Sequence, residues 1–295
     1  MPRGSEQLSR GADADPAIEW VAHRVGGFEQ LLVLGVATDA ASRGVALLRQ
    51  SAARFGIGVS LVGLGSAYPC HAFKVVALRA ALEQALERYE LVLFVDAYDT
   101  LFMTDLDEIL AKYRALDAPF VMSAEIVRSP PEGPPEELFP PAPTPFRFPN
   151  SGGFVAPPAA VLRALERFDR PEVWRTDNDQ AFWSDVYLEG GSDDAIRLDH
   201  GCSIFQCQWW SEQTLRPLRR PLARTGRMRN RVTGARPCLF HANGFCDLEA
   251  GARWILGSSY RPPPDRRIFH GLRRGRWRQR VWRRWPWRAD GVAKD

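Results

Sequence analysis

The sequence predicts an α/β fold in which a mixed, mainly parallel sheet carries helices on both of its faces. Residues 31–38 and 91–95 are short apolar runs of the kind found in strands that are buried on both faces. The segments between them alternate helical spacing with one more strand-like run, and each connection is long enough for a right-handed crossover. This order of strand, helix, strand, helix and strand is typical of the start of a doubly wound sheet.

The first half of the chain supplies the expected elements one after another. Residues 1–27 are expected to be peripheral, with a short helix over residues 18–25. Asp105 and Glu108 stand at capping positions of a later helix. The expected elements are a strand over 31–38, a helix over 42–55, a strand over 58–65, a helix over 71–89, a strand over 91–95, a helix over 105–116 and a strand over 120–124.

The second half begins with a proline-rich stretch, residues 129–149, that cannot form regular secondary structure. A loop of this length in a compact domain is either a flap over a site or a disordered insertion, and the sequence favours neither. Together with the elements that follow, one domain is expected over residues 28–260. Those elements are a strand at 150–155, a helix at 157–168, a helix from 177, short strands at 196–200 and 203–206, and a last strand at 237–244.

The positive charge of the chain is concentrated near its C-terminal end. The formal net charge is +4, yet ten arginines and no acid lie between Arg266 and Arg288, within a tail of residues 261–295. Tryptophans interleave with these arginines, a composition that suits anionic membrane surfaces or single-stranded nucleic acid. We expect peripheral contact with an anionic membrane and no nucleic-acid role, and a poorly ordered basic end is the plainer alternative.

Cysteine usage and hydropathy indicate a reducing compartment. The five cysteines contain no Cys-x-x-Cys pair, which argues against a disulfide framework and against a structural zinc site. No apolar run reaches the roughly 18 residues of a membrane span, and residues 1–16 lack the apolar core of a secretory signal. The expected location is therefore cytoplasmic, with or without peripheral attachment to a membrane.

Asp96 and Asp99 directly follow the apolar strand expected at residues 91–95. Ligands of parallel sheets lie beyond the carboxyl ends of the strands, so both acids fall where a ligand would bind. Two neighbouring carboxylates repel each other, and a divalent cation held by oxygen ligands removes that repulsion. The pattern therefore predicts a metal site, and a pair of loop acids that cap the following helix is the alternative.

Two further segments hold candidate functional residues. His241 ends the last expected strand and is a candidate third metal ligand, although a histidine at a strand end is more often an ordinary surface residue. Asp177 and Asp179 open a helix together with the amides of Asn178 and Gln180. Acids at a helix start are commonly caps, but this mixture of acids and amides also suits recognition of a hydroxyl group.

Six short motifs occur along the chain in a fixed order. They are Val-Asp-Ala-Tyr-Asp at 95–99, Ser-Ala-Glu at 123–125, Asn-Ser-Gly-Gly-Phe at 150–154, Asp-Gln-x-Phe at 179–182, Leu-Asp-His at 198–200 with Ile-Phe-Gln at 204–206, and His-x-Asn-Gly at 241–244. Their order and spacing resemble the glycosyltransferase domain of the procollagen lysyl hydroxylase/glucosyltransferase family. The resemblance covers residues 31–244, and the iron-binding hydroxylase domain of that family has no counterpart in this sequence.

The resemblance implies a GT-A fold, a Rossmann-like domain that uses a UDP-sugar with Mn²⁺ or another divalent cation. It implies that Asp96, Asp99 and His241 bind the metal and that Asp179 and Asp177 act on the acceptor side. The implied reaction moves a hexose from a UDP-hexose donor to a hydroxyl group of a glycan, a lipid or a protein. The positions implied to bind the nucleotide-sugar are Thr38, Tyr68, Lys74, Asp96, Tyr98, Asn150, Gly152, Asn243 and Gly244.

Three positions depart from the family pattern. Asn178 stands where an acid of the family's poly-Asp run is expected, and Tyr68 replaces a tryptophan that stacks on uracil. A tryptophan expected soon after Ser-Ala-Glu is missing, because Arg128 and Ser129 occupy that place. These departures leave two other interpretations open. One is a non-catalytic, degenerate nucleotide-sugar-binding module with a functional basic tail, and the other is a metal-dependent phosphoester hydrolase.

Overall fold

The structure, a computed structural model, describes residues 18–169, 178–190, 196–208, 227–244 and 246–262. Two compact units are present, Met1–Tyr260 and Arg261–Asp295, and every described helix and strand belongs to the first. Asp177 and nearly all of the basic tail predicted from the sequence lie outside the described residues. Among the described residues, no helix is both long and apolar enough to cross a bilayer.

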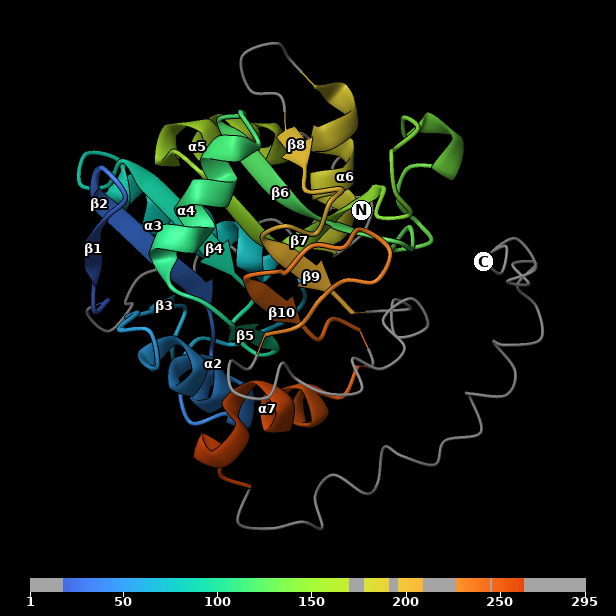
Figure 1. Cartoon of the computed structure of the whole chain (residues 1–295). Coiled ribbons are helices and arrows are strands. Elements are labelled where there is room, and N and C mark those ends of the chain that lie inside the picture. Colours follow the sequence, from blue (N-terminus) through green and yellow to red (C-terminus); the bar gives the residue numbers. More distant parts are fainter. Residues whose placement is uncertain (1–17, 170–177, 191–195, 209–226, 245, 263–295) are drawn as a thin grey trace, which may run out of the picture. The chain divides into compact units, whose positions relative to one another are not determined.

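Ten strands and six longer helices are described in the first unit (Figure 1). The strands are β1 (Ala22–Val25), β2 (Phe28–Val36), β3 (Ser60–Val62), β4 (Leu91–Val95), β5 (Thr100–Phe102), β6 (Phe120–Glu125), β7 (Phe148–Ala156), β8 (Ile196–Leu198), β9 (Phe205–Cys207) and β10 (Leu239–His241). The helices are α2 (Arg43–Ala53), α3 (Phe73–Ala85), α4 (Leu106–Ala115), α5 (Pro158–Leu165), α6 (Asp179–Glu189) and α7 (Leu248–Leu256), with short 3₁₀ turns at Glu136–Leu138, Glu166–Asp169 and Gly257–Ser259.

The main sheet has seven strands in the order β1-β2-β4-β7-β6-β8, with β3 paired to β2. β2 pairs in parallel with β3 and β4, and β6 pairs in parallel with β8. β7 runs antiparallel between β4 and β6, and β1 runs antiparallel to β2. The predicted mixed sheet is confirmed, with parallel and antiparallel pairings balanced among the described strands. Because β7 is antiparallel to both of its neighbours, the carboxyl ends of β4 and β6 lie at the same edge.

Helices cover both faces of the main sheet, and successive side chains of the central strands point alternately to the two faces. Leu32, Leu34 and Phe94 belong to the apolar cluster that contains α3, α5 and α6. Leu31 and Leu93 belong to the cluster that contains α2 and α4 on the other face. Successive side chains of a strand point to opposite faces, so a strand covered on both sides has to be apolar throughout. The continuous apolar runs in the sequence are explained by this arrangement.

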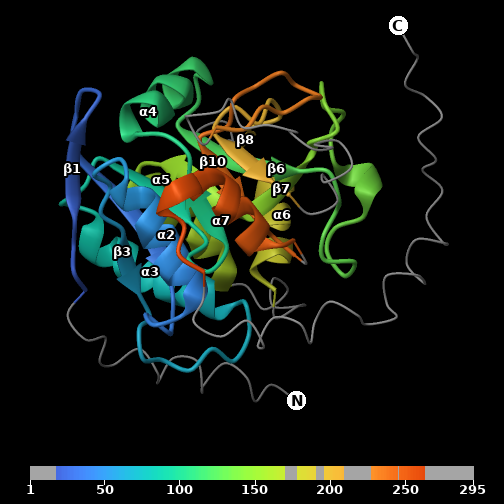
Figure 2. The same ribbon diagram turned by 60° about the horizontal axis from the view of Figure 1, so that its bottom comes forward.

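A smaller sheet, in the order β5-β10-β9, lies next to the main sheet and had not been predicted as a unit. β10 is antiparallel to β5 and parallel to β9. Helix α7, which was not predicted, packs its apolar residues against β5 and β10 and lies beside α2 (Figure 2). The Arg43 guanidinium at the start of α2 is paired with Glu249 of α7 at 2.7 Å. These contacts hold the smaller sheet, through β5 and β10, against α2 and α7.

The helix predicted over residues 18–25 is wrong, because these residues contain strand β1. Gly26 and Gly27 both have positive φ angles and form the tight turn that folds β1 back on β2. A left-handed backbone at two successive positions is easily adopted only by glycine. The glycine pair and the cross-strand pairing therefore override the helical spacing of the apolar residues.

The proline-rich loop, residues 127–147, is held together by two arginines. Arg128 donates hydrogen bonds to four backbone carbonyls of residues 130–134, at 3.1 to 3.2 Å. Arg147 donates to the carbonyls of Glu136, Phe139 and Pro140. Over residues 129–147 only one short 3₁₀ turn interrupts the irregular backbone, as the proline content predicts, but Phe148 and Pro149, which were also expected to be irregular, begin strand β7. The loop is therefore an ordered part of the domain rather than the disordered insertion that was one of two alternatives.

Candidate functional site

The site lies at the edge where the carboxyl ends of β4 and β6 meet the start of β7. The register between β6 and β7 shifts after Met122, which pairs with Phe154, whereas Ser123 pairs with Asn150. The residues skipped by this shift are Ser151, Gly152 and Gly153, the centre of the Asn-Ser-Gly-Gly-Phe motif. A bulge of this kind redirects the backbone at a strand end. Here it brings the glycine pair against the smaller sheet.

Pairing in the smaller sheet carries His241 to the two acids. His241 pairs with Thr100, the residue that directly follows Asp99, and the backbone N–H of Ala242 donates to the Asp99 carbonyl at 2.8 Å. On the other side, the N–H of Asp96 donates to the Gly152 carbonyl at 2.9 Å. Residues that are far apart in the sequence are therefore tied together by backbone hydrogen bonds.

Asp96, Asp99 and His241 form the only group of three potential metal ligands among the residues that the structure describes. One ligand atom from each lies within 4.8 Å of the others. Nε2 of His241 is 3.2 Å from Oδ1 of Asp99 and 3.5 Å from Oδ2 of Asp96, but it is aligned with neither oxygen as a hydrogen bond. A buried ring nitrogen without a partner, facing two carboxylate oxygens, is what a divalent cation requires. The predicted ligand set therefore fits a metal ion.

Gly152 makes room for the imidazole of His241. A Cβ atom at this position would lie 2.0 Å from Cε1 of His241 and 2.7 Å from Nδ1. Such distances are far below van der Waals contact, so any side chain at residue 152 would displace the ring. Gly152, which the family resemblance implies to be a nucleotide-sugar residue, lies against His241.

Lys74 links Asp96 and Asp179 in a chain of charges. Its ammonium lies 2.8 Å from Oδ1 of Asp96 and 2.8 Å from Oδ2 of Asp179, and its side chain is 12% exposed. Burial by itself would lower the pKa of Lys74, but the charges of Asp179 and Asp96 outweigh burial and raise it. Lys74 therefore stays protonated and occupies one oxygen of Asp96, leaving the other oxygen toward His241.

Opposite charges also determine the protonation of the acid and the imidazole. Burial would raise the pKa of Asp96, but the Lys74 ammonium and contact with His241 hold it below its usual range. Burial would lower the pKa of His241, and the Asp99 charge together with contact to Asp96 raises it well above its usual value instead. In the absence of a cation the imidazole is thus protonated, and it carries the positive charge that the two carboxylates require.

Glu125, at the end of β6, is a site residue that the sequence analysis did not assign. It is 1% exposed and accepts hydrogen bonds from side-chain amides of Asn150, Gln180 and Asn243. These amides come from β7, from α6 and from the segment after β10. Burial raises the pKa of Glu125 to about 7, despite these donors. The Glu125 carboxyl group thereby joins β7, α6 and the segment after β10.

Tyr98 connects the acid pair to the end of β2. Its phenolic oxygen accepts hydrogen bonds from the backbone N–H groups of Thr38, at 2.8 Å, and Asp39, at 3.1 Å. Helix α2 packs closely against the turn at Tyr98. A Cβ atom at Gly44 would lie only 1.9 Å from the Tyr98 carbonyl oxygen, so no side chain fits there. Thr38 and Tyr98, both predicted to line the nucleotide pocket, are therefore in direct contact.

The departures from the family pattern have structural roles of their own. Asn178 caps α6, since its side-chain oxygen accepts a hydrogen bond from the Gln180 backbone N–H at 2.9 Å. Tyr68 is 39% exposed and packs edge-on against Phe73. The distance between its hydroxyl oxygen and Nδ1 of His71 is 3.0 Å. Burial of the hydroxyl raises the pKa of Tyr68, and the nearby Lys74 opposes that shift. An exposed aromatic face beside Lys74 is compatible with stacking on a base.

The structure thus brings most predicted site residues together. Those joined by direct contacts around the acid pair are Thr38, Lys74, Asp96, Tyr98, Asp99, Asn150, Gly152, Asp179, His241 and Asn243. Gly244 follows Asn243 in a turn with a φ of 70°. Besides Glu125, the sequence analysis missed Gln180 as a buried ligand of Glu125 and Cys207 beside His241. Glu125 could have been found from its place after an apolar strand, the same signal that identified Asp96.

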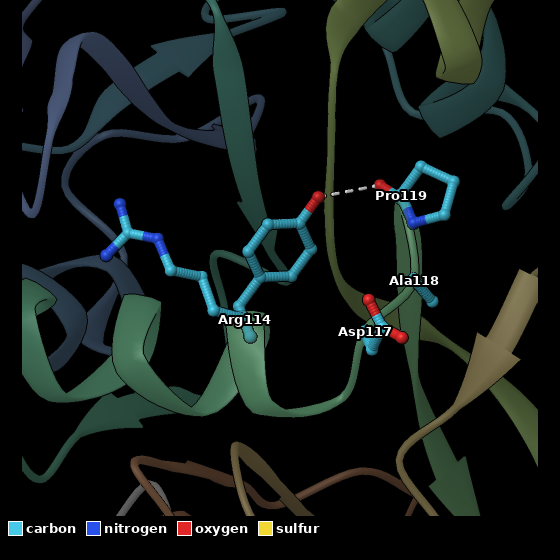
Figure 3. A pocket seen from close by; sticks show the side chains of 5 residues that line it. Arg114, Asp117, Ala118 and Pro119 are labelled. Atoms are coloured by element: carbon cyan, nitrogen blue, oxygen red, sulfur yellow. Dashed lines mark hydrogen bonds between the residues drawn. The ribbon is translucent and has the colours of Figure 1, made fainter.

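One surface pocket lies at the other end of the sheet. It has a volume of about 410 Å³ and is lined by Tyr113, Arg114, Asp117, Ala118 and Pro119 (Figure 3). Tyr113 donates a hydrogen bond to the Pro119 carbonyl at 2.9 Å, at the start of β6. Glu125 and the acid pair lie at the carboxyl ends of β6 and β4, so this pocket is separate from the site.

Comparison with known proteins shows a family match over most of the chain. The family model described as the PLOD GT domain matches residues 28–251. The bovine (Bos taurus) procollagen-lysine,2-oxoglutarate 5-dioxygenase 1 is 32% identical over 187 residues, which are 60% of this chain and 25% of that protein. The chicken (Gallus gallus) protein of the same name is 31% identical over 232 residues, which are 75% of this chain and 31% of that protein.

A human relative and two solved structures complete the comparison. The Homo sapiens multifunctional procollagen lysine hydroxylase and glycosyltransferase LH3 is 30% identical over 189 residues, which are 60% of this chain and 25% of LH3. The galactosyltransferase LgtC, solved with donor and acceptor sugar analogues, has 14% identity, a TM-score of 0.47 and coverage of 79% of this chain and 97% of its own. Mouse xyloside xylosyltransferase 1 has 11% identity, a TM-score of 0.46 and coverage of 74% and 99%.

The family assignment depends on the extent of the sequence match. The matched range, residues 28–251, begins at β2 and includes every residue of the acid and imidazole cluster. The chain spans only about a quarter to a third of the length of the dioxygenases that it matches. Over most of its length, this chain belongs to the family of PLOD glycosyltransferase domains.

Proposed function

We propose that this protein is a metal-dependent glycosyltransferase that moves a hexose from a UDP-sugar to a hydroxyl acceptor. The observation that carries the proposal is the cluster of Asp96, Asp99 and His241, with the partnerless Nε2 of His241 facing both carboxylates. The family match supports glycosyl transfer as the type of reaction. The donor nucleotide, the hexose and Mn²⁺ as the cation are our proposal from the resemblance of the motifs.

The residues present suit departure of a diphosphate. Breaking the bond between the anomeric carbon and the diphosphate leaves negative charge on the diphosphate oxygen, and a cation held by Asp96, Asp99 and His241 would stabilise that charge as a Lewis acid. The Lys74 ammonium, 2.8 Å from Asp96, is placed to supply a second positive group. Tyr68 and the Thr38 edge would hold the nucleotide.

Asp179 is proposed to act on the acceptor. Its carboxylate orients the acceptor hydroxyl and accepts the proton that this hydroxyl loses as its oxygen bonds to the anomeric carbon. Asp179 is paired with the Lys74 ammonium at 2.8 Å. The diphosphate of a bound donor would attract the same ammonium and so compete with Asp179. Donor binding would thereby make the Asp179 oxygens available to the acceptor.

The test is donor turnover by the purified chain with a panel of UDP-hexoses, detected as UDP release, with Mn²⁺ and with EDTA. We expect release only with the metal, and loss of release in Asp99→Ala. Asp107→Ala is the matched control, because Asp107 is exposed in the first turn of α4. Undiminished turnover in Asp99→Ala would refute the metal assignment. Turnover of phosphoesters that carry no sugar nucleotide would instead support a hydrolase.

The acceptor and the membrane partner are separate proposals from the sequence. The acceptor is a hydroxyl group of a glycan, a lipid or a protein, and mass detection of the glycosylated product with each class would identify it.

We propose a cytoplasmic location with peripheral attachment to anionic membranes through Arg266–Arg288. Each arginine near the membrane surface would contribute about 1 kcal/mol of binding free energy. Flotation with anionic liposomes that persists after deletion of residues 263–295 would disprove this attachment.

A further inference from the structure

Cys207 lies directly beside the imidazole that the proposed cation requires. Strands β9 and β10 are parallel, and their register sets Cys207 opposite His241. The Cys207 Sγ atom is 3.8 Å from Nδ1 of His241, within hydrogen-bonding distance for sulfur. Cys207 is 1% exposed, so the contact is shielded from water.

Three contacts together determine how the His241 ring is placed. The Gly152 backbone lies against Cε1, where no side chain would fit. Nε2 faces the oxygens of Asp99 and Asp96, and Nδ1 faces the Cys207 sulfur. Sulfur accepts hydrogen bonds weakly, and a nitrogen that binds a metal carries no proton. With the proton on Nδ1 and directed to sulfur, the lone pair of Nε2 points to the carboxylates.

We propose that Cys207 is a positioning residue that fixes the tautomer and the orientation of His241 for metal binding. The inference rests on the proposed function, because it concerns the same metal site. Cys207 acts through His241 and is not itself a ligand of that ion, since Nδ1 and Nε2 lie on different sides of the ring. Metal-bound histidines commonly donate their second N–H to a carboxylate or a carbonyl, and here a thiol occupies that place.

The chemistry of sulfur gives the proposal a specific consequence. A thiol is a weaker acceptor than a carboxylate, so it holds the ring with little added negative charge. The site would therefore combine two carboxylate ligands with an imidazole whose partner at Nδ1 adds little negative charge. Cys207→Ala replaces the thiol group by a hydrogen atom and so removes the hydrogen-bond acceptor. Cys207→Ser keeps an acceptor, the hydroxyl oxygen, which has a smaller radius than sulfur.

The experiment measures Mn²⁺ binding to the purified chain by electron paramagnetic resonance of the free ion, which needs no turnover. We expect Cys207→Ala to bind Mn²⁺ about tenfold more weakly, at the lower end of the usual effect of losing such a partner, and Cys207→Ser to recover part of that loss. Cys238→Ala is the matched control. Cys238 is also a buried thiol outside any disulfide and directly precedes β10, but it contacts Lys112 rather than His241.

The outcomes separate this inference from the proposed function. If the unaltered protein fails to bind Mn²⁺, the proposed metal dependence fails. If the unaltered protein and Cys207→Ala bind Mn²⁺ equally, the metal site stands and the role of Cys207 is disproved. Should Cys207→Ala not fold, nitrogen NMR of the unaltered protein with Mg²⁺ decides, because a proton on Nε2 of His241 instead of Nδ1 would overturn the proposal.

Discussion

A Cβ atom at Gly152 would lie 2.0 Å from Cε1 of His241, so the imidazole occupies space that only a glycine leaves open. We expect Gly152→Ala to push the ring away from Asp96 and Asp99. Mn²⁺ affinity should fall at least tenfold, and the free energy of unfolding should fall by about 1–3 kcal/mol from overpacking. Calorimetric titration with Mn²⁺ and urea unfolding would measure the two effects.

Gly201→Ala is the control for this prediction. The nearest atom to a Cβ at Gly201 is 3.9 Å away, and this glycine does not have the positive φ that disfavours side chains. We expect its metal affinity to equal that of the unaltered protein. Normal Mn²⁺ binding by Gly152→Ala would show that the ring can move without loss and would contradict the proposed packing.

Replacing Lys74 should damage both stability and turnover. Lys74→Met leaves the half-buried carboxylate of Asp96 and the buried carboxylate of Asp179 without their shared cation, which we expect to lower the free energy of unfolding by about 3–5 kcal/mol. Turnover of the donor should fall by roughly 10²–10³-fold, as for removal of one group that stabilises developing charge. Chemical denaturation and UDP release would give the two values.

Arg79→Met is the matched control in the same helix. Arg79 pairs with Glu83 one turn along α3, at 3.2 Å, and the two side chains are 34% and 58% exposed. Exposed pairs of this spacing contribute only about 0.3–0.5 kcal/mol, so stability and turnover should stay nearly unchanged. Equal effects of the two substitutions would mean that Lys74 has no special electrostatic role.

Glu125 should make stability depend on pH. Its pKa rises from 4.5 in the unfolded chain to about 7 in the fold, so below pH 4.5 the carboxyl is protonated in both states. As the pH rises toward 7, the unfolded chain ionises first, and the folded state loses about 3 kcal/mol of relative stability. Above pH 7 both states are ionised and the loss is complete.

The prediction for Glu125 is measured by urea unfolding in EDTA over this pH range, with Glu125→Gln as the comparison. The difference in free energy of unfolding between the unaltered protein and the variant should fall by about 3 kcal/mol from pH 4.5 to above pH 7. Other titrating groups contribute to both proteins and cancel. A difference independent of pH would show that the Glu125 carboxyl has an ordinary pKa in the fold.

Much of the fold can be predicted from the sequence because its main strands are buried on both faces. Leu91–Val95 is apolar throughout, and the structure places it at the centre of the sheet with no polar face. Strand β5 was missed because three residues are too few for a periodic signal, and its partner β10 lies far along the chain. Strand β1 was mistaken for a helix from the spacing of its apolar residues, although the Gly26-Gly27 pair that follows is a local signal of a hairpin turn.

The site was predictable to the extent that its residues follow recognisable strands. Asp96 and Asp99 were found by their place after an apolar run, and His241 by its place at the end of the last strand. Glu125 was not assigned although it ends an apolar strand, because the sequence does not show that the amides of Asn150, Gln180 and Asn243 converge on it. Cys207 was missed since its relation to His241 depends on strand register alone.

The contact between Tyr98 and Thr38 ties the metal-ligand turn to the edge that would hold the nucleotide. A displacement of that turn on cation binding would therefore move Thr38, and a displacement of Thr38 on nucleotide binding would move the turn. Thermodynamic linkage requires the same factor in both directions: whatever the metal adds to UDP affinity, UDP must add to metal affinity. Tyr98→Phe, which removes the connecting hydroxyl, should bring this cooperativity factor closer to one in titrations done in both orders of addition.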